Sequence, residues 1–172
     1  MTKRSILTLV LATVCLGACV SGRCTVRATQ LDAGYGHACA VLDDGQLTCW
    51  GEGTGLMPNP SLVPTLVGLG DVRSIAVGLD FRCAVTTDDE VWCWGDNYNG
   101  QCGIGSISTE VTTPTSLMGS AGAVARTFAD YRHACALETD GTARCWGSNR
   151  FIQLGDQVTD HMESCASDDC SS

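Results

Sequence analysis

The chain has 172 residues, of which ten are basic and nineteen acidic, so its net charge at pH 7 is −9. Proteins that bind nucleic acid normally present a basic face, and this composition excludes such a face. The length suits one domain, and twelve cysteines exceed what a core of that size requires. The composition therefore indicates short strands and loops held by covalent bridges.

The N-terminal segment indicates export. Lys3 and Arg4 precede an apolar run at residues 6–16 that is too short to span a bilayer. The run ends in Leu16-Gly17-Ala18-Cys19, which resembles the lipobox of bacterial lipoproteins. We therefore expect residues 1–18 to be a signal peptide that carries Cys15 away, and Cys19 to be lipidated at a bacterial membrane. An ordinary secretory signal and an uncleaved anchor are the alternatives, and each places the chain outside the cytosol, where disulfides persist.

Residues 19–30 show no periodicity and are predicted to be a tether. A pattern then occurs three times: Cys-Ala, a second cysteine ten residues after the first, and Trp-Gly. Successive copies start 44 and 52 residues apart, a period typical of solenoids, propellers and arrays. Each copy opens with a short apolar segment, and we expect strands at residues 31–34, 74–78 and 126–130.

Each pair of cysteines is symmetric about a turn signal. In the first copy, the loop Asp43-Asp44-Gly45 pairs Cys39 with Cys49, and glycine occupies the position that usually has positive φ. The other loops are residues 87–89, with Asp89 in that position, and residues 139–141. The register makes each cysteine pair non-hydrogen-bonded, with Cα atoms about 4.5 Å apart, which suits a disulfide. The predicted disulfides are Cys39–Cys49, Cys83–Cys93 and Cys135–Cys145.

Free thiols and a zinc site are the alternative uses of these cysteines. Three pairs of free buried thiols would suit a cytosolic chain. A zinc site needs closely spaced cysteines that converge, and nine intervening residues are too many for such a knuckle. Cys24, Cys102, Cys165 and Cys170 have no assigned partner.

The rest of the chain has no helical period. Residues 51–71 and 95–122 contain prolines or many Gly, Ser and Thr residues and are expected to be long connections. Residues 156–172 are acidic and are expected to be a tail or an incomplete repeat. The prediction is therefore an all-β fold with its repeats at residues 31–155.

The repeats resemble the regulator of chromosome condensation repeat, in particular its cysteine-bearing form in secreted bacterial proteins. The third copy contains His133-Ala134-Cys135-Ala136-Leu137, Asp140-Gly141, Cys145-Trp146-Gly147-Ser148-Asn149 and Gln153-Leu154-Gly155. Phe81 stands where the other copies have His37 and His133, Cys102 replaces a leucine, Ile152 replaces a glycine, and the first copy lacks the Gly-Gln-Leu-Gly segment. The resemblance implies four-stranded blades of a seven-bladed propeller.

About three blades cannot close such a ring, because propellers typically have about 4–8 blades. We therefore expect a partial propeller: an open arc, a truncated reading frame or part of an oligomeric ring. Uncovered edges would favour self-association.

The expected function is a non-catalytic binding or scaffold module outside the cytoplasm, lipid-anchored in the periplasm or at the cell surface, with an unknown protein or glycan partner. We expect no catalytic residue, cofactor, metal or nucleic acid.

The repeated His37 and His133 and the tryptophans Trp50, Trp94 and Trp146 are expected to have packing roles. Asp43, Asp44, Asp88, Asp89 and Asp140 suit turns, and Asp96-Asn97-Tyr98 is a poor calcium loop. The alternatives are an extracellular hydrolase that uses loop carboxylates and a fragment of a longer propeller. The nucleotide-exchange activity of eukaryotic relatives is not expected here.

Overall fold

The structure is a computed structural model that describes residues 19–20, 23–24, 27–52, 61–119 and 122–155. Within these residues, all regular structure is β-strand, and the sheets are antiparallel. No helix in this part of the chain is long and apolar enough to cross a membrane. The all-β prediction is therefore confirmed.

Three sheets follow one another along the chain, and we call them blades 1, 2 and 3. Blade 1 comprises β3 (Ala28–Ala33), β4 (His37–Leu42), β5 (Leu47–Gly51) and β6 (Ser61–Leu66). Blade 2 comprises β7 (Val72–Val77), β8 (Phe81–Thr86), β9 (Val91–Asp96) and β10 (Glu110–Ser116). Blade 3 comprises β11 (Val124–Asp130), β12 (His133–Glu138) and β13 (Ala143–Gly147). A separate short pair consists of β1 (Cys19–Val20) and β2 (Arg23–Cys24).

The first strand of every blade begins two or three residues before the predicted position. β3 starts at Ala28, so its first three residues lie in the segment predicted to be a tether. The register shifts after Ala28, Val72 and Val124, which is a bulge at the same place in each blade. A bulge interrupts the alternation of side chains between faces, and this explains why a periodic pattern missed these residues.

The fourth strands of blades 1 and 2 lie in segments that were expected to be connections. β6 contains Pro64 and β10 contains Pro114. Both strands lie at the outer edge of their sheet, where a missing N–H removes no inner ladder bond. Blade 3 has three strands within the described residues.

The hairpin turns agree with the prediction. Gly45, Asp89 and Gly141 have φ values of 79°, 68° and 92°. In the first turn, the Gly45 N–H donates to the Leu42 carbonyl at 3.0 Å, and the Leu42 N–H donates to the Gln46 carbonyl at 2.9 Å. The turn chemistry therefore sets the register of each hairpin.

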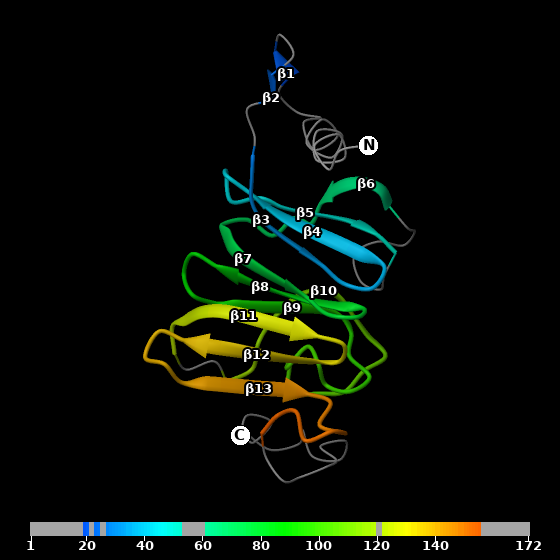
Figure 1. Cartoon of the computed structure of the whole chain (residues 1–172), viewed down its shortest axis with the longest axis vertical. Coiled ribbons are helices and arrows are strands. Elements are labelled where there is room, and N and C mark those ends of the chain that lie inside the picture. Colours follow the sequence, from blue (N-terminus) through cyan, green and yellow to red (C-terminus); the bar gives the residue numbers. More distant parts are fainter. Residues whose placement is uncertain (1–18, 21–22, 25–26, 53–60, 120–121, 156–172) are drawn as a thin grey trace, which may run out of the picture.

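The blades are stacked, with blade 2 between blades 1 and 3 (Figure 1). The first strand of one blade packs on the two innermost strands of the blade before it: β7 contacts β3 and β4, and β11 contacts β7 and β8. Both faces of blade 2 are therefore covered, and all six residues of β8 are buried. The core lies between the blades and includes Leu47, Ile75 and Trp94.

Candidate functional site

The three predicted cysteine pairs lie directly opposite each other in the β4–β5, β8–β9 and β12–β13 hairpins. Their Cα atoms are 4.1, 4.2 and 4.0 Å apart, and the sulfur atoms are within bonding distance. The first two pairs are buried between blades, whereas Cys135 and Cys145 are half-buried. These cysteines stabilise hairpins and are not arranged as metal ligands.

The proposed lipidation site, Cys19, is the first residue of β1 and lies opposite Cys24 of β2. The predicted signal peptide, the acidic tail, Cys165 and Cys170 lie outside the described residues. Lipidation and the signal peptide therefore stay predictions.

Cys102 is a free, fully buried thiol in the loop after β9. Its Sγ lies 3.6 Å from the main-chain oxygen of Asp96. Burial, and then the Asp96 carboxylate, raises the pKa of Cys102 to about 12, so the thiol stays protonated and is a poor nucleophile. The equivalent residue in blade 3 is Leu154, which agrees with a packing role.

His37 and Arg82 bring two basic side chains together between blades 1 and 2. His37 is only 5 % exposed and Arg82 only 3 %. Burial, and then the charge of Arg82, lowers the pKa of His37 to about 4, although the Phe81 main chain opposes the shift. Burial also lowers the pKa of Arg82 to about 10, against the attraction of Asp80. At neutral pH, His37 is an uncharged packing residue.

Three carboxylates of the hairpin turns are engaged by their own turns. Asp44 accepts the Gln46 N–H at 3.1 Å, and Asp140 accepts the Thr142 N–H at 2.8 Å. The Thr86 hydroxyl donates to Asp88 at 2.5 Å. Hydrogen bonds from Thr86 and Thr142 lower the pKa of Asp88 and of Asp140, respectively. A general acid needs the opposite shift, so these groups are suited to holding turns.

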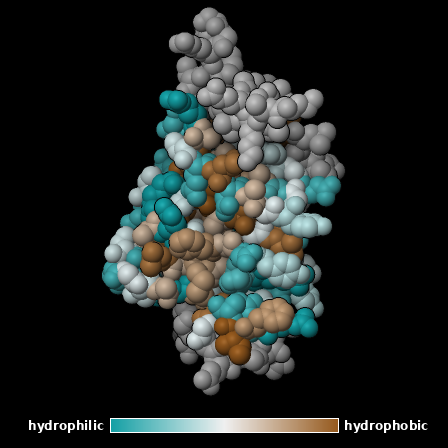
Figure 2. Space-filling view, in the orientation of Figure 1, coloured by the Kyte–Doolittle hydropathy of each residue, from teal (hydrophilic) through white to brown (hydrophobic). Residues whose placement is uncertain are grey.

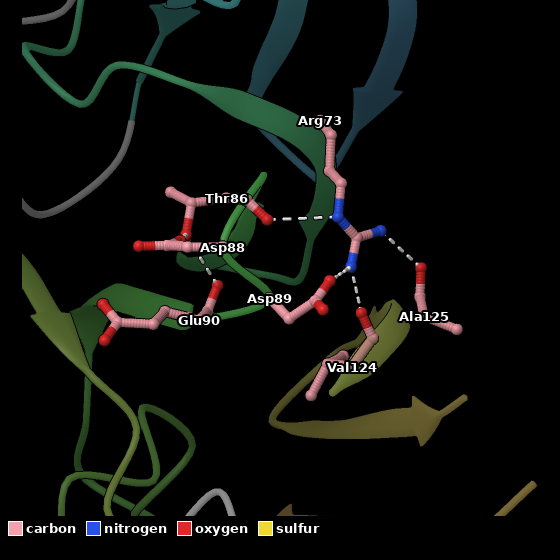
Figure 3. Close-up of polar contacts among 7 residues, drawn as sticks. All are labelled: Arg73, Thr86, Asp88, Asp89, Glu90, Val124 and Ala125. Carbon is pink, nitrogen blue, oxygen red and sulfur yellow. Dashed lines mark hydrogen bonds and ion pairs between the residues drawn. The ribbon is translucent and has the colours of Figure 1, made fainter. Parts of the chain in front are cut away.

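Arg73 of β7 forms a second polar cluster, shown in Figure 3, that joins blade 2 to blade 3. Its guanidinium donates to the Ala125 carbonyl at 2.8 Å and also to the Val124 carbonyl. It also contacts the Asp89 carboxylate at 2.7 Å and the Thr86 carbonyl at 3.1 Å. No repeat motif contains Arg73, so the sequence pattern does not predict this cluster.

The loop after β9 is organised by the repeat residues Asn97 and Gln101. The Asn97 amide oxygen accepts the Cys102 N–H at 3.0 Å, and Gln101 donates to the Asp96 carboxylate at 2.9 Å. The indole N–H of Trp146, in blade 3, donates to the Gln101 carbonyl at 2.9 Å. The loop therefore holds the next blade. No group of three or more His, Cys, Asp or Glu residues that could hold a metal ion occurs in the described part of the chain.

The ends of the blades differ. In an antiparallel meander, the tight hairpin turns occupy one end, and the longer loops after the first and third strands occupy the other, which we call the loop end. The loop end consists of residues 34–36, 52, 78–80, 97–109, 131–132 and 148–155. Its exposed aromatic side chains are Tyr35, Tyr98, Tyr131 and Phe151.

The loop end is also tied together across blades. The Leu79 N–H donates to the Tyr131 carbonyl at 2.9 Å, and the Arg132 guanidinium lies 5.4 Å from the centre of the Tyr131 ring. On the face shown in Figure 2, apolar surface occurs as separate patches among hydrophilic residues. Exposed aromatic groups on a hydrogen-bonded loop surface suit contact with a partner better than reaction chemistry.

Two profiles of one known repeat family match the blades described above. One profile of the regulator of chromosome condensation (RCC1) repeat matches residues 28–54, 72–101 and 131–153, which correspond to the three blades. A second profile of the same repeat matches residues 88–137. The chain belongs to the RCC1 repeat family. In this RCC1-repeat protein, the Trp-Gly and Gly-Gln motifs coincide with the contact between Trp146 and Gln101.

Solved structures show the same fold. Human WBSCR16 is 23 % identical with a TM-score of 0.68, and the match covers 78 % of this chain and 37 % of WBSCR16. Prp20p from Saccharomyces cerevisiae is 25 % identical with a TM-score of 0.69, covering 78 % and 34 % of the two chains. Yeast RCC1 (Prp20) bound to Kap60 is 20 % identical with a TM-score of 0.68, covering 77 % and 35 %. This RCC1-repeat chain spans about a third of these proteins.

Proposed function

We propose that this RCC1-repeat protein is a non-catalytic binding or scaffold module that contacts a protein partner through its loop end. The observation that carries the proposal is the contrast between the two ends of the blades. Carboxylates at the hairpin turns are held by hydrogen bonds or an ion pair within the molecule, whereas Tyr35, Tyr98, Tyr131 and Phe151 are exposed at the other end. Aromatic side chains of this kind contribute strongly to protein interfaces.

The similar yeast proteins support a protein as the class of partner. One crystal structure describes RCC1 (Prp20) bound to Kap60, and another names the binding of Prp20p to Gsp1p and histones. The yeast proteins that bind those partners are about three times as long as the region that matches this chain. We therefore propose only that the partner is a protein. A glycan that stacks on the aromatic rings is the alternative ligand.

Site-specific photocrosslinking tests which end of the blades binds. A benzophenone amino acid is placed at Tyr35 or Tyr131, and at Thr87 or Thr139 as matched controls at the hairpin end. We expect the first two positions to yield the same protein crosslink in the native host, and the control positions to yield none. Equal crosslinking at both ends, or at the hairpin end alone, would contradict the proposal.

We further propose that the module works outside the cytoplasm and is anchored by a lipid on Cys19. The Leu16-Gly17-Ala18-Cys19 sequence supports the anchor, and three cysteine pairs at disulfide distance support an oxidising compartment. Metabolic labelling with a palmitate analogue in a bacterial host should label the natural chain. Cys19→Ser should abolish labelling, whereas Cys24→Ser should retain it. Undiminished labelling of Cys19→Ser would exclude this site.

A further inference from the structure

One face of blade 3 exposes apolar side chains to solvent, whereas the corresponding face of blade 2 is buried. In β12, Ala134, Ala136 and Glu138 are buried, whereas the residues between them are half-buried or exposed. The alternation arises because successive side chains of a strand point to opposite faces. The buried set faces blade 2. We call the opposite face the rear face of blade 3, and it carries Phe128 and Leu137, which are 50 % and 39 % exposed.

The same positions in blade 2 show what such a face normally contacts. Phe128 corresponds to Ala76 and Leu137 to Val85, and both blade 2 residues are at most 2 % exposed. Blade 3 covers them, because β11 packs on β7 and β8. The Thr127 hydroxyl of β11 donates to the Cys83 carbonyl at 3.5 Å across this contact. The molecule therefore contains an example of the surface that fits a rear face: the front of a blade's first strand.

At the other end of the arc, no blade of the described part of the chain covers the front face of β3. Leu31 of β3 occupies the position of Ile75 in β7 and is 57 % exposed, although Ile75 is 1 % exposed. Ala33, at the position of Val77, is also exposed. The front of β3 thus has the same place in its blade as the fronts of β7 and β11, which pack on the preceding blade, and Leu31 is apolar like Ile75.

We propose that copies of this chain associate head to tail, with the front of β3 in one copy packed on the rear face of blade 3 in another. Leu31 would contact the Cys135–Cys145 hairpin, as Thr127 contacts Cys83. In the proposed contact, the bulky Phe128 would face the small Ala33. The equivalent residues between blades 1 and 2 are the smaller Asp32 and the larger Val77, which are in contact. The side chains that differ between the repeats therefore compensate in size.

Polar groups at the two open faces match as well. Between blades 1 and 2, the Gln30 amide donates to the Ile75 carbonyl at 2.9 Å. In blade 3, Arg126 occupies the position that Gln30 has in blade 1. Its guanidinium would donate to the Leu31 carbonyl of the next copy. Trp50, at the position of Trp146, would donate its indole N–H to the Gln153 carbonyl, as Trp146 does to Gln101.

The contact joins different surfaces of the two copies, so it is heterologous and gives a ring if the rotation closes. The described parts of two copies together contain six blades, which lies within the range of about 4–8 in closed propellers. Each copy carries a net charge of −9, so moderate salt should favour association by screening repulsion.

Two variants, each of which blocks one of the two surfaces, test whether the contact is head to tail. Leu31→Asp blocks the front of β3, and Phe128→Asp blocks the rear face of blade 3; both positions are exposed, so folding should be unaffected. The full chain carries Cys19→Ser to remove the proposed lipid site, and its free thiols are alkylated under native conditions. In sedimentation velocity at moderate salt, we expect the parent chain to form dimers or larger oligomers as concentration rises, and each variant to stay monomeric.

An equimolar mixture of the two variants is the decisive sample. It retains one intact contact between an unblocked β3 and an unblocked blade 3, and we expect a one-to-one dimer. Met118→Asp, at an exposed position just after β10 of blade 2, should associate like the parent chain. A parent chain that stays monomeric at the highest attainable concentration would overturn the proposal. So would folded variants that still associate alone, or a mixture that stays monomeric.

Discussion

His37 is a titratable side chain in a position where the fold disfavours its charged form. It lies between blades 1 and 2, close to Arg82, and its pKa is lowered from 6.5 to about 4. The unfolded chain therefore binds a proton at His37 more readily than the folded chain does. It follows that the free energy of unfolding decreases as the pH falls from about 6.5 to about 4, and this contribution is complete below the folded pKa.

Replacing His37 by phenylalanine should remove that pH dependence. Phe81 occupies the equivalent position in blade 2 and is fully buried, so the larger ring is compatible with this place in a blade. We expect His37→Phe to abolish a loss of up to about 3 kcal/mol between pH 6.5 and pH 4. Urea unfolding at pH 7, 5.5 and 4.5 measures it.

The carboxylates provide the contrast in that experiment. Asp88 and Asp140 have lowered pKa values, so the stability they contribute is lost only as the pH falls below their ordinary value of 3.8. The His37→Phe variant should therefore retain acid sensitivity below pH 4. Equal slopes for the two chains between pH 6.5 and 4.5 would show that His37 titrates normally in the folded state.

At the scale of a single element, the hairpin turns depend on residues with positive φ. Gly141 has a φ of 92°, and a Cβ atom at this position would meet nothing within 4 Å. Gly141→Ala should therefore destabilise the protein by about 1–2 kcal/mol through backbone conformation alone. Gly70 also has open space, but its φ lies outside the left-handed region, so Gly70→Ala is the control and should cost little. Thermal unfolding of both variants measures the difference, and equal costs would contradict the turn assignment.

Arg73 is the side chain on which the contact between β7 and β11 depends. Arg73→Met removes its hydrogen bonds to the Val124 and Ala125 carbonyls, which we expect to cost about 1–3 kcal/mol. Amide hydrogen exchange should accelerate in β11 and β12 more than in β4 and β5. Asp89→Asn keeps the carbonyl contacts and removes only an exposed ion pair, so its effect should be smaller. Uniform acceleration in all blades would argue against a local link.

The hairpins could be predicted from the sequence because all their determinants are local. Cysteine spacing, Gly45 or its equivalents, and the alternating side chains lie within eleven residues of one another. The beginnings of β3, β7 and β11 could not, because a bulge interrupts the alternation. β6 and β10 are edge strands that contain proline, so they lack the pattern of an inner strand.

The candidate site was predictable only where it overlaps the repeat motif. The motif identified His37, the cysteine pairs and the turn carboxylates. Arg73 was missed because its partners, Val124 and Ala125, contribute main-chain carbonyls that any residue possesses and lie about fifty residues away. The aromatic residues of the loop end occupy variable loop positions, and only the folded arrangement brings Leu79 to Tyr131.

For the whole molecule, the neighbours of each blade determine how accessible its disulfide is. Cys83 and Cys93 are fully buried at the contact between blades 2 and 3, whereas Cys135 and Cys145 lie on the open rear face of blade 3. Mild reduction of the native protein should therefore open Cys135–Cys145 first, because thiol–disulfide exchange requires access to the sulfur. Timed alkylation followed by peptide mapping identifies the order. Simultaneous opening of all three pairs, or linkage between different hairpins, would contradict this arrangement.

The three described disulfides also determine how the molecule would respond to a pulling force. Each joins two strands of one hairpin, and none of the three connects one blade to another. Between blades, the described contacts are side-chain packing and hydrogen bonds such as those of Arg73 and Trp146. Tension along the chain would therefore peel the blades apart one after another, while every crosslinked hairpin keeps its strands paired. The blades of such a chain would separate one at a time without any covalent bond being broken.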